Sequence, residues 1–289
     1  MPIPIPEALS EHATLAATKA TASRNLPRYL LSAAMAGAFV GVAVVLLLTV
    51  SGPLAAAGSG FTKLVSGAVF GVALTLVVFA GAELVTGNMM VMAQGLLART
   101  ATWAGSTKVV VVALVGNFVG SVLFALVVHG GGVFATGPAA DLLASTVAAK
   151  DALSGPQLFW RAVLCNMLVC LGLWMAARTR SDVAKLVVLW WALLAFISSG
   201  FEHSVANMTT FALAALAGTG DWAMLGRNLL WTVPGNLVGG AVVVGAVYAY
   251  LGSSPRTALH STTPGAANGT TSDAPASTNG SAPVPVAGR

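Results

Sequence analysis

Charge is scarce in this sequence. Only 8% of the 289 residues are Asp, Glu, Lys or Arg, whereas soluble domains carry about 25%. With 56% hydrophobic residues and a mean hydropathy of +0.84, the chain cannot cover itself with a soluble surface. This excludes the soluble protein classes and predicts an integral membrane protein. The formal net charge of +5 is spread over short polar segments, which indicates membrane topology and not nucleic-acid binding.

Cysteine is also rare. Cys165 and Cys170 lie in one apolar run, and five residues along a helix correspond to a rotation of about 140°, so the two side chains point to different faces. We therefore expect packing residues, not a disulfide or a metal pair, and we expect no metal and no cofactor. Residues 1–28 lack an apolar core, so no cleavable signal peptide is predicted.

Six apolar segments are long enough to span a membrane, which takes about 20 residues. They cover approximately Tyr29–Val50, Lys63–Leu97, Lys108–Val128, Leu158–Ala177, Val183–Ala217 and Leu225–Leu251. The second and the fifth are each about 35 residues long, and polar residues interrupt both near the middle. The pattern predicts an all-α membrane protein with six transmembrane helices, of which the second and the fifth are broken.

The two ends of the chain differ from this transmembrane domain, residues 29–251. Residues 1–28 are polar, and the weakly amphipathic stretch after Glu7 predicts a cytoplasmic segment with a helix on the membrane surface. Residues 252–289 are rich in Ser, Thr, Pro, Gly and Ala, which is typical of a disordered tail. With both termini cytoplasmic, that side carries ten basic residues and the other side four. We expect a multi-pass protein of the inner (plasma) membrane in this orientation.

Two motifs recur at one spacing. The stretch Gly81–Met89 returns as Gly200–Met208, with Gly, Glu, Asn and Met in the same places, 119 residues later. The stretch Gly116–Gly120 returns as Gly235–Gly239 at the same offset. These matches predict two repeats, about residues 29–130 and 150–251. Each repeat holds three spans, and an odd number inserts the second copy upside down relative to the first.

Inverted repeats with interrupted helices point to a permeation site near the bilayer midplane. Each break exposes the backbone amides at the start of a half-helix, which carries roughly half a positive charge. Two such starts that face each other favour an anion. The second break also holds Glu202 and His203, and ionisable groups inside a membrane are costly enough to indicate function.

The residues around both breaks resemble the signature motifs of the formate/nitrite transporter family. The motifs are Ala82–Asn88, Phe201–Met208, Leu164–Cys170 and Gly235-Asn236, and the resemblance covers about residues 6–251. It implies a homopentamer of aquaporin-like protomers in the lipid bilayer, each with its own pore. It also implies transport of small monovalent anions such as formate or nitrite, or of their protonated acids. Hydrosulfide, acetate and lactate are alternative substrates.

The resemblance also assigns residues to the transport pathway. His203 is the central histidine, Thr86 faces it from the other broken helix, Lys150 lies in the outer vestibule and Asn166 in the pore. The inner constriction is formed by Phe70, Leu74 and Phe196, and the outer one by Leu84 and Val85. Formate channels commonly have phenylalanine at the position of Val85, so the smaller valine is expected to widen the outer constriction.

His203 is expected to carry the chemistry. Burial disfavours a charged imidazole, but an arriving anion makes its protonation favourable, because opposite charges attract strongly at low dielectric. Our hypothesis is that the anion gains a proton or a strong hydrogen bond from His203 and crosses as the neutral acid. The equivalent Glu83 and Glu202 are predicted to cap backbone amides at the breaks. Asn88 and Asn207 are predicted to support the same breaks.

Other readings stay open at this point. Asn166 fits interhelical hydrogen bonding as well as the pore, and Asn117 and Asn236 are predicted to be structural. An intramembrane enzyme using His203 and Glu202 is disfavoured because the sequence has no His-Glu-x-x-His or Gly-x-Ser-x-Gly motif. A water or neutral-solute channel of the aquaporin type lacks its paired Asn-Pro-Ala motifs. We therefore predict a transporter and no enzyme.

Overall fold

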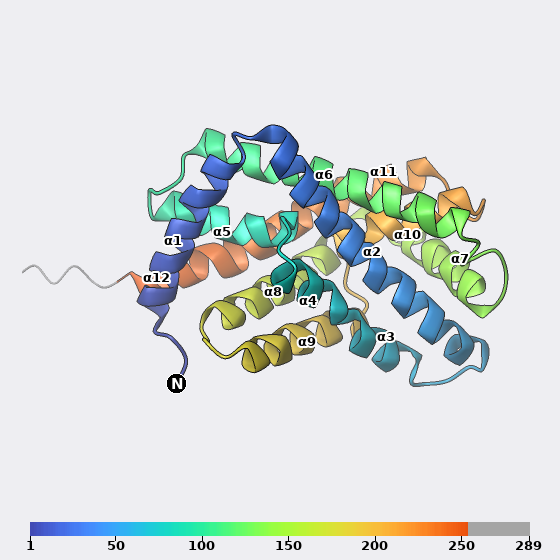
Figure 1. Ribbon diagram of the computed structural model, residues 1–289. Coiled ribbons are helices and arrows are strands. Elements are labelled where there is room, and N and C mark those ends of the chain that lie inside the picture. Colours follow the sequence, from blue (N-terminus) through green and yellow to red (C-terminus); the bar gives the residue numbers. More distant parts are fainter. Residues whose placement is uncertain (254–289) are drawn as a thin grey trace, which may run out of the picture. The chain divides into compact units, whose positions relative to one another are not determined.

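The computed structural model describes residues 1–253, and every regular element in that range is a helix, so the all-α prediction is confirmed (Figure 1). The predicted disordered tail lies outside the described residues from position 254 onward. The helices, in chain order, are α1 (Ile5–Ala22), α2 (Leu26–Ala56), α3 (Thr62–Phe70), α4 (Val72–Phe79), α5 (Val85–Leu97), α6 (Trp103–Gly130), α7 (Pro138–Asp151), α8 (Gly155–Ala177), α9 (Asp182–Ser198), α10 (Ser204–Leu216), α11 (Trp222–Leu237), the π-helix η1 (Val238–Ala246) and α12 (Val247–Gly252).

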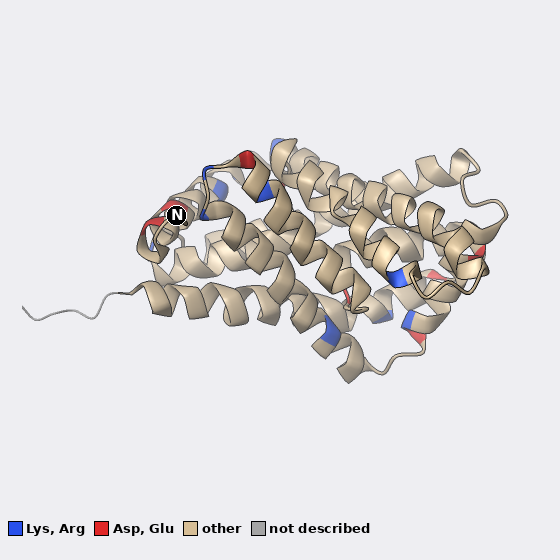
Figure 2. Ribbon diagram, turned by 90° about the horizontal axis from the view of Figure 1, so that it is seen from below, with Lys and Arg blue, Asp and Glu red and all other residues tan. Residues whose placement is uncertain are grey.

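Several of these helices can cross a membrane. Within residues 1–253, five are long and apolar enough: Leu26–Ala56, Thr62–Phe79, Trp103–Gly130, Gly155–Ala177 and Trp222–Gly252. The fifth predicted segment is divided between α9 and the short apolar α10. Charged residues lie mainly toward the two ends of the helices (Figure 2). The chain is a multi-pass membrane protein.

The two long apolar segments are interrupted where the sequence predicts. Helix α4 ends at Phe79 and α5 begins at Val85, while α9 ends at Ser198 and α10 begins at Ser204. Gly81 and Gly200, which occupy the same place in the two motifs, have φ angles of +79° and +72°. Glycine adopts this left-handed conformation without steric cost, and it turns the chain sharply out of the first half-helix.

Glycines also bring pairs of long helices into backbone contact. A Cβ atom on Gly120 of α6 would lie 1.8 Å from the carbonyl oxygen of Ala34 in α2. A Cβ atom on Gly239 of η1 would lie 2.2 Å from the carbonyl oxygen of Val163 in α8. Close approach through small residues is the usual way in which helices associate in lipid. The two contacts hold α6 against α2 and η1 against α8.

Helix α1 is not a membrane span but packs against α5, α6 and α12. Ile3, just before the helix, exchanges two 2.8 Å hydrogen bonds with Arg178: the Ile3 amide donates to the Arg178 carbonyl, and Arg178 Nε donates to the Ile3 carbonyl. Arg180 forms ion pairs with Glu7 and Glu11 of α1. The helix is therefore fastened to the loop between α8 and α9 as well as to α5.

His12 makes the docking of α1 sensitive to pH. Its Nδ1 lies 2.6 Å from Gln94 Oε1 of α5, and its ring meets Trp174 edge-on at a centroid distance of 5.3 Å. Burial lowers the pKa of His12 from its ordinary 6.5, because desolvation penalises the imidazolium. The docked helix therefore holds the neutral ring. We expect the contribution of His12 to the docking free energy to be fully present above a pH of about 6.5 and to be lost as the pH falls through the lowered pKa.

Hydrogen exchange checks this expectation. After correction for the intrinsic pH dependence of exchange, the protection of the α1 amides should decrease between a pH of about 7.5 and about 5. His12→Asn is the matched control, since an amide offers Gln94 a partner but does not titrate. Its protection should be independent of pH. Wild-type protection that stays constant over this range would contradict the expectation.

Candidate functional site

The two breaks meet at His203 and Thr86. Thr86 lies in the first turn of α5, and His203 immediately precedes α10. His203 Nε2 is 3.1 Å from Thr86 Oγ1, and only 4% of the histidine and none of the threonine is exposed. The structure thus places the predicted hydroxyl in hydrogen-bonding contact with the predicted central imidazole. The ring of Phe196 stacks on His203 at a centroid distance of 5.9 Å.

The hydrogen bonds of His203 define which of its nitrogens carries the proton. The backbone amide of Ala206 donates to Nδ1 across 3.1 Å, so Nδ1 is the acceptor and caps the start of α10. A neutral imidazole with an accepting Nδ1 carries its hydrogen on Nε2. That N–H points at Thr86, whose oxygen can accept it. The site therefore offers a donor to a molecule that takes the place of the threonine hydroxyl.

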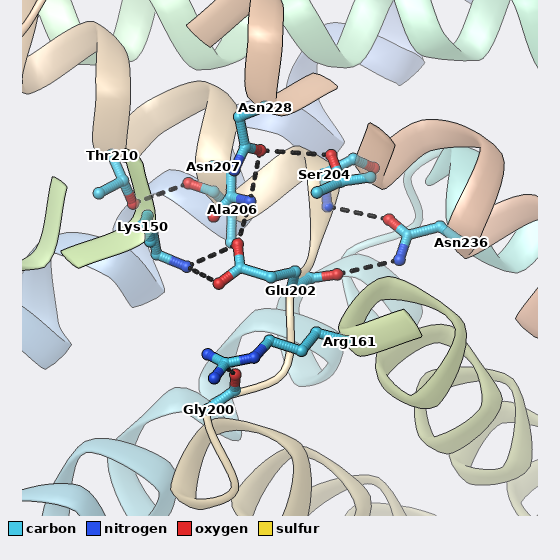
Figure 3. Close-up of polar contacts among 11 residues, drawn as sticks. Lys150, Arg161, Gly200, Glu202, Ser204, Ala206, Asn207, Thr210, Asn228 and Asn236 are labelled. Atoms are coloured by element: carbon cyan, nitrogen blue, oxygen red, sulfur yellow. Dashed lines mark hydrogen bonds and ion pairs between the residues drawn. The ribbon is translucent and has the colours of Figure 1, made fainter. Parts of the chain in front are cut away.

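Two asparagines satisfy the backbone at the breaks. Asn117 Oδ1 accepts the Val85 amide at 2.9 Å, and its Nδ2 donates to the carbonyls of Glu83 and Ala33 at 2.9 and 2.7 Å. Asn236 repeats the pattern with the Ser204 amide at 2.9 Å and the Glu202 carbonyl at 3.0 Å (Figure 3), and with the Ala162 carbonyl at 2.8 Å. Each amide side chain supplies one acceptor and two donors, as an interrupted helix requires.

Glu83 and Glu202 have a different task from the predicted one. Glu83 Oε2 accepts from Lys19 Nζ at 2.6 Å and from Tyr29 Oη and Asn88 Nδ2, both at 3.0 Å. Glu202 accepts from Lys150 Nζ at 2.8 and 2.9 Å and from Asn207 Nδ2 at 2.7 Å (Figure 3).

The prediction that the carboxylates cap backbone amides is wrong. A carboxylate only accepts hydrogen bonds and cannot satisfy the carbonyls beside the break, so the asparagines fill this position.

Sequence reasoning found Lys150 but missed Lys19. Helix α7 brings Lys150 to Glu202, and α1 brings Lys19 to Glu83, so each break carries one partly buried lysine–glutamate pair. Lys19 does not stand at the 119-residue offset from Lys150, and so the motif repeat does not reveal it. The signal in the sequence that could have indicated a partner such as Lys19 was Glu83 itself, because a glutamate inside a membrane requires a cation near it.

A cavity lies on each side of the central pair. One, of about 470 Å³, is lined by Lys19, Glu83 and Leu84 among other residues. The other, of about 70 Å³, is lined by Lys150, Phe70, Phe196 and His203 among others. A narrow gap lined by Phe70, Leu74, Leu84 and His203 lies between them.

This arrangement corrects the predicted positions of the constrictions. Phe70 and Phe196, with ring centroids 5.6 Å apart, lie at the Lys150 end and not at the end that holds α1. Leu84 lies at the α1 end and not at the Lys150 end. The reason is the direction of the chain, because α3 starts at the Lys150 end and the loop 80–84 turns toward Lys19. Val85 is fully buried and donates its amide to Asn117.

Asn166 lies behind the central pair. Its Nδ2 donates to the carbonyls of Thr86 and Asn236 at 3.2 and 2.7 Å, and none of its surface is exposed. Cys165 and Cys170 are free and buried, which confirms them as packing residues. In the part of the chain that is described, no group of three His, Cys, Asp or Glu side chains is placed to hold a metal ion. The polar groups at the centre are thus one imidazole, one hydroxyl and their supporting amides.

Comparison with known proteins places this site in a family. A family model described as formate/nitrite transporter matches residues 7–250. The nitrite transporter NirC of Salmonella typhimurium is 41% identical over 248 residues, which are 84% of this chain and 91% of that protein. The formate channel BtFdhC of Bacillus thuringiensis is 36% identical over 230 residues, which are 78% of this chain and 87% of that protein.

Solved structures agree with these matches. An FNT family ion channel shares 40% sequence identity and superposes with a TM-score of 0.80, covering 86% of this chain and 99% of its own. A pentameric formate channel with formate bound shares 27% identity with a TM-score of 0.64, covering 80% and 98%. From its sequence, its fold and the paired breaks around His203, the chain belongs to the formate/nitrite transporter family.

Proposed function

We propose that this protein carries small monovalent anions, foremost nitrite and formate, past Thr86 and His203. The observation that supports this most directly is the His203–Thr86 hydrogen bond at the junction of the two breaks. Each end of the path holds a lysine–glutamate pair, and the gap between them is lined by apolar side chains apart from His203. The names of the relatives, a nitrite transporter and a formate channel, support the same substrates.

The proposed architecture is a homopentamer of protomers with six spans in two inverted repeats. The contacts around the breaks support the repeat, because Asn117 and Asn236 make the same three kinds of hydrogen bond in the two halves. The pentameric formate channel supports the assembly. The proposed location is the inner membrane with both termini in the cytoplasm.

In the proposed mechanism the anion enters beside one of the two lysine–glutamate pairs, and the centre neutralises it. Moving a carboxylate-sized charge from water into a medium of low dielectric costs on the order of 20 kcal/mol, so an unprotonated anion crosses the apolar gap only with strong compensation. The Nε2–H of His203 supplies a hydrogen bond at this point. This donation leaves the contact between Nδ1 and the Ala206 amide in place. Full transfer of a proton requires the imidazolium, whose Nδ1 no longer accepts the Ala206 amide.

A reconstituted uptake panel tests the proposed function. Purified protein in liposomes should take up nitrite and formate faster than empty liposomes, and an inward proton gradient should increase the rate because the acid crosses in neutral form. Hydrosulfide, acetate and lactate complete the panel and identify the preferred substrate. Stopped-flow water permeability is the control. Raised water permeability without uptake of any of these anions would refute the proposal in favour of a neutral-solute channel.

A further inference from the structure

Within residues 1–253, the two ends of the transport path differ in one unpaired cation, Arg161, which lies at the Lys150 end. We propose that Arg161 forms an anion-capture site at the Lys150 end, selective for planar anions with two oxygen atoms. This inference rests on the proposed function, because it assigns a capture step to the same transport path.

Arg161 belongs to the wall of the second break. It lies on α8, and its own carbonyl accepts the Glu202 amide at 3.3 Å. Its half-buried side chain extends along the loop toward Gly200, whose carbonyl is 3.4 Å from Nη1 (Figure 3). This long contact uses one of five N–H donors of the guanidinium. The remaining donors are available to a ligand.

The charge of Arg161 is not compensated within residues 1–253. Lys150, the other cation at this break, is held by both carboxylate oxygens of Glu202, but Arg161 forms no ion pair with any described residue. Apart from Gly200 itself and its two neighbours in the chain, no residue places an atom within 4 Å of the position that a Cβ atom would occupy on Gly200. The loop beside the guanidinium therefore borders open space.

The first break has no such cation at the matching position. There the carbonyl that accepts the Glu83 amide, also at 3.3 Å, belongs to Ser32. Two lysines line the cavity at that end, and both have acidic partners: Lys19 pairs with Glu83, and Lys185 with Asp182 at 2.9 Å. One end of the path thus carries an uncompensated positive charge that raises the local anion concentration.

The shape of the group indicates which anions it takes. A guanidinium presents parallel N–H donors in a planar fork that matches two oxygen atoms on one centre. Nitrite and formate have this geometry, and hydrosulfide does not. An ammonium in the same place would attract all three by charge alone. Arg161 therefore acts as a specificity-determining residue ahead of His203.

Initial uptake into liposomes with the Lys150 end facing outward, at low ionic strength, tests the inference. Arg161→Ser, which copies the first break, should raise the nitrite concentration for half-maximal uptake about three- to tenfold and leave the maximal rate within about twofold. Arg161→Lys should preserve hydrosulfide uptake but weaken nitrite uptake. Lys63→Gln is the matched control, since it removes the same charge from α3 beside Ser198.

Several results would overturn the inference. Unchanged nitrite dependence in Arg161→Ser would do so, as would an equal loss in Lys63→Gln. A lower maximal rate at every salt concentration, shared by Arg161→Lys, would show that the side chain only positions the loop at Gly200. In all these cases the wild type transports nitrite. Wild-type protein that takes up neither nitrite nor formate would instead refute the proposed function, and the inference with it.

Discussion

His203→Ala is expected to reduce pH-dependent uptake of nitrite and formate by about 100-fold or more, the usual contribution of a positioned acid–base group. The variant removes the Nε2–H donor that faces Thr86 and leaves the anion without compensation in the apolar gap. Initial rates in liposomes, with and without an inward proton gradient, provide the measurement. Wild-type rates in this variant would rule out the central role of the imidazole.

A second substitution separates transport from folding. His203 also caps α10 through Nδ1, so alanine leaves the Ala206 amide without its acceptor. His203→Asn restores an N-cap oxygen but has no ring to titrate. It should therefore match the wild type in thermal stability and the alanine variant in transport. Thr86→Val, which keeps the shape of the side chain, should reduce uptake less than either, because Nε2–H remains free to donate to the substrate.

Asn236→Leu is expected to destabilise the fold more than any surface substitution. It removes hydrogen bonds from the Ser204 amide and from the carbonyls of Glu202 and Ala162. The Ala162 carbonyl keeps its helical partner within α8, so the Ser204 amide and the Glu202 carbonyl are the two groups that lose theirs. Each unsatisfied group costs about 1–3 kcal/mol, so the total is roughly 2 kcal/mol or more. The measurement is the temperature at which detergent-solubilised protein loses its monodisperse elution peak, which should fall by several degrees.

Thr232→Val is the control for this experiment. Thr232 is buried in the same helix, and its hydroxyl donates only to Asn228 Oδ1, which also accepts from Asn207. Its loss therefore leaves no buried acceptor without a donor, and the melting temperature should stay close to that of the wild type. If the two variants melted alike, the asparagine would not be the residue that holds the break together.

The outline of the site could be predicted from the sequence because its residues are local to each break. Gly81 and Gly200 mark the turns, and the shared spacing of Glu, Asn and Met identifies the pair. The position of Thr86 opposite His203 was implied by the resemblance to the formate/nitrite transporter family. The breaks themselves follow from the repeated spacing and from the cost of polar groups in lipid, and both are visible in one sequence.

The long-range partners could not be predicted in the same way. Lys19 reaches Glu83 because α1 folds back under α5, and no spacing in the chain records this contact. The positions of Phe70 and Phe196 at the Lys150 end, and of Leu84 at the α1 end, were wrongly predicted for a similar reason. A linear count from Phe70 to Leu84 does not show that the loop 80–84 turns Leu84 toward α1. The role of Glu83 and Glu202 depends on which side chains donate hydrogen bonds to them, and only the folded structure shows these neighbours.

The unequal sizes of the two cavities have a consequence for hydration. The space of about 470 Å³ beside Lys19 can admit an anion together with most of its water shell, whereas the space of about 70 Å³ beside Lys150 holds only a few water molecules. An anion that enters at Lys150 must therefore shed its water at once, between two phenylalanine rings. One that enters beside Lys19 sheds it later, at Leu84. The barrier to dehydration thus lies at different depths for the two directions of travel.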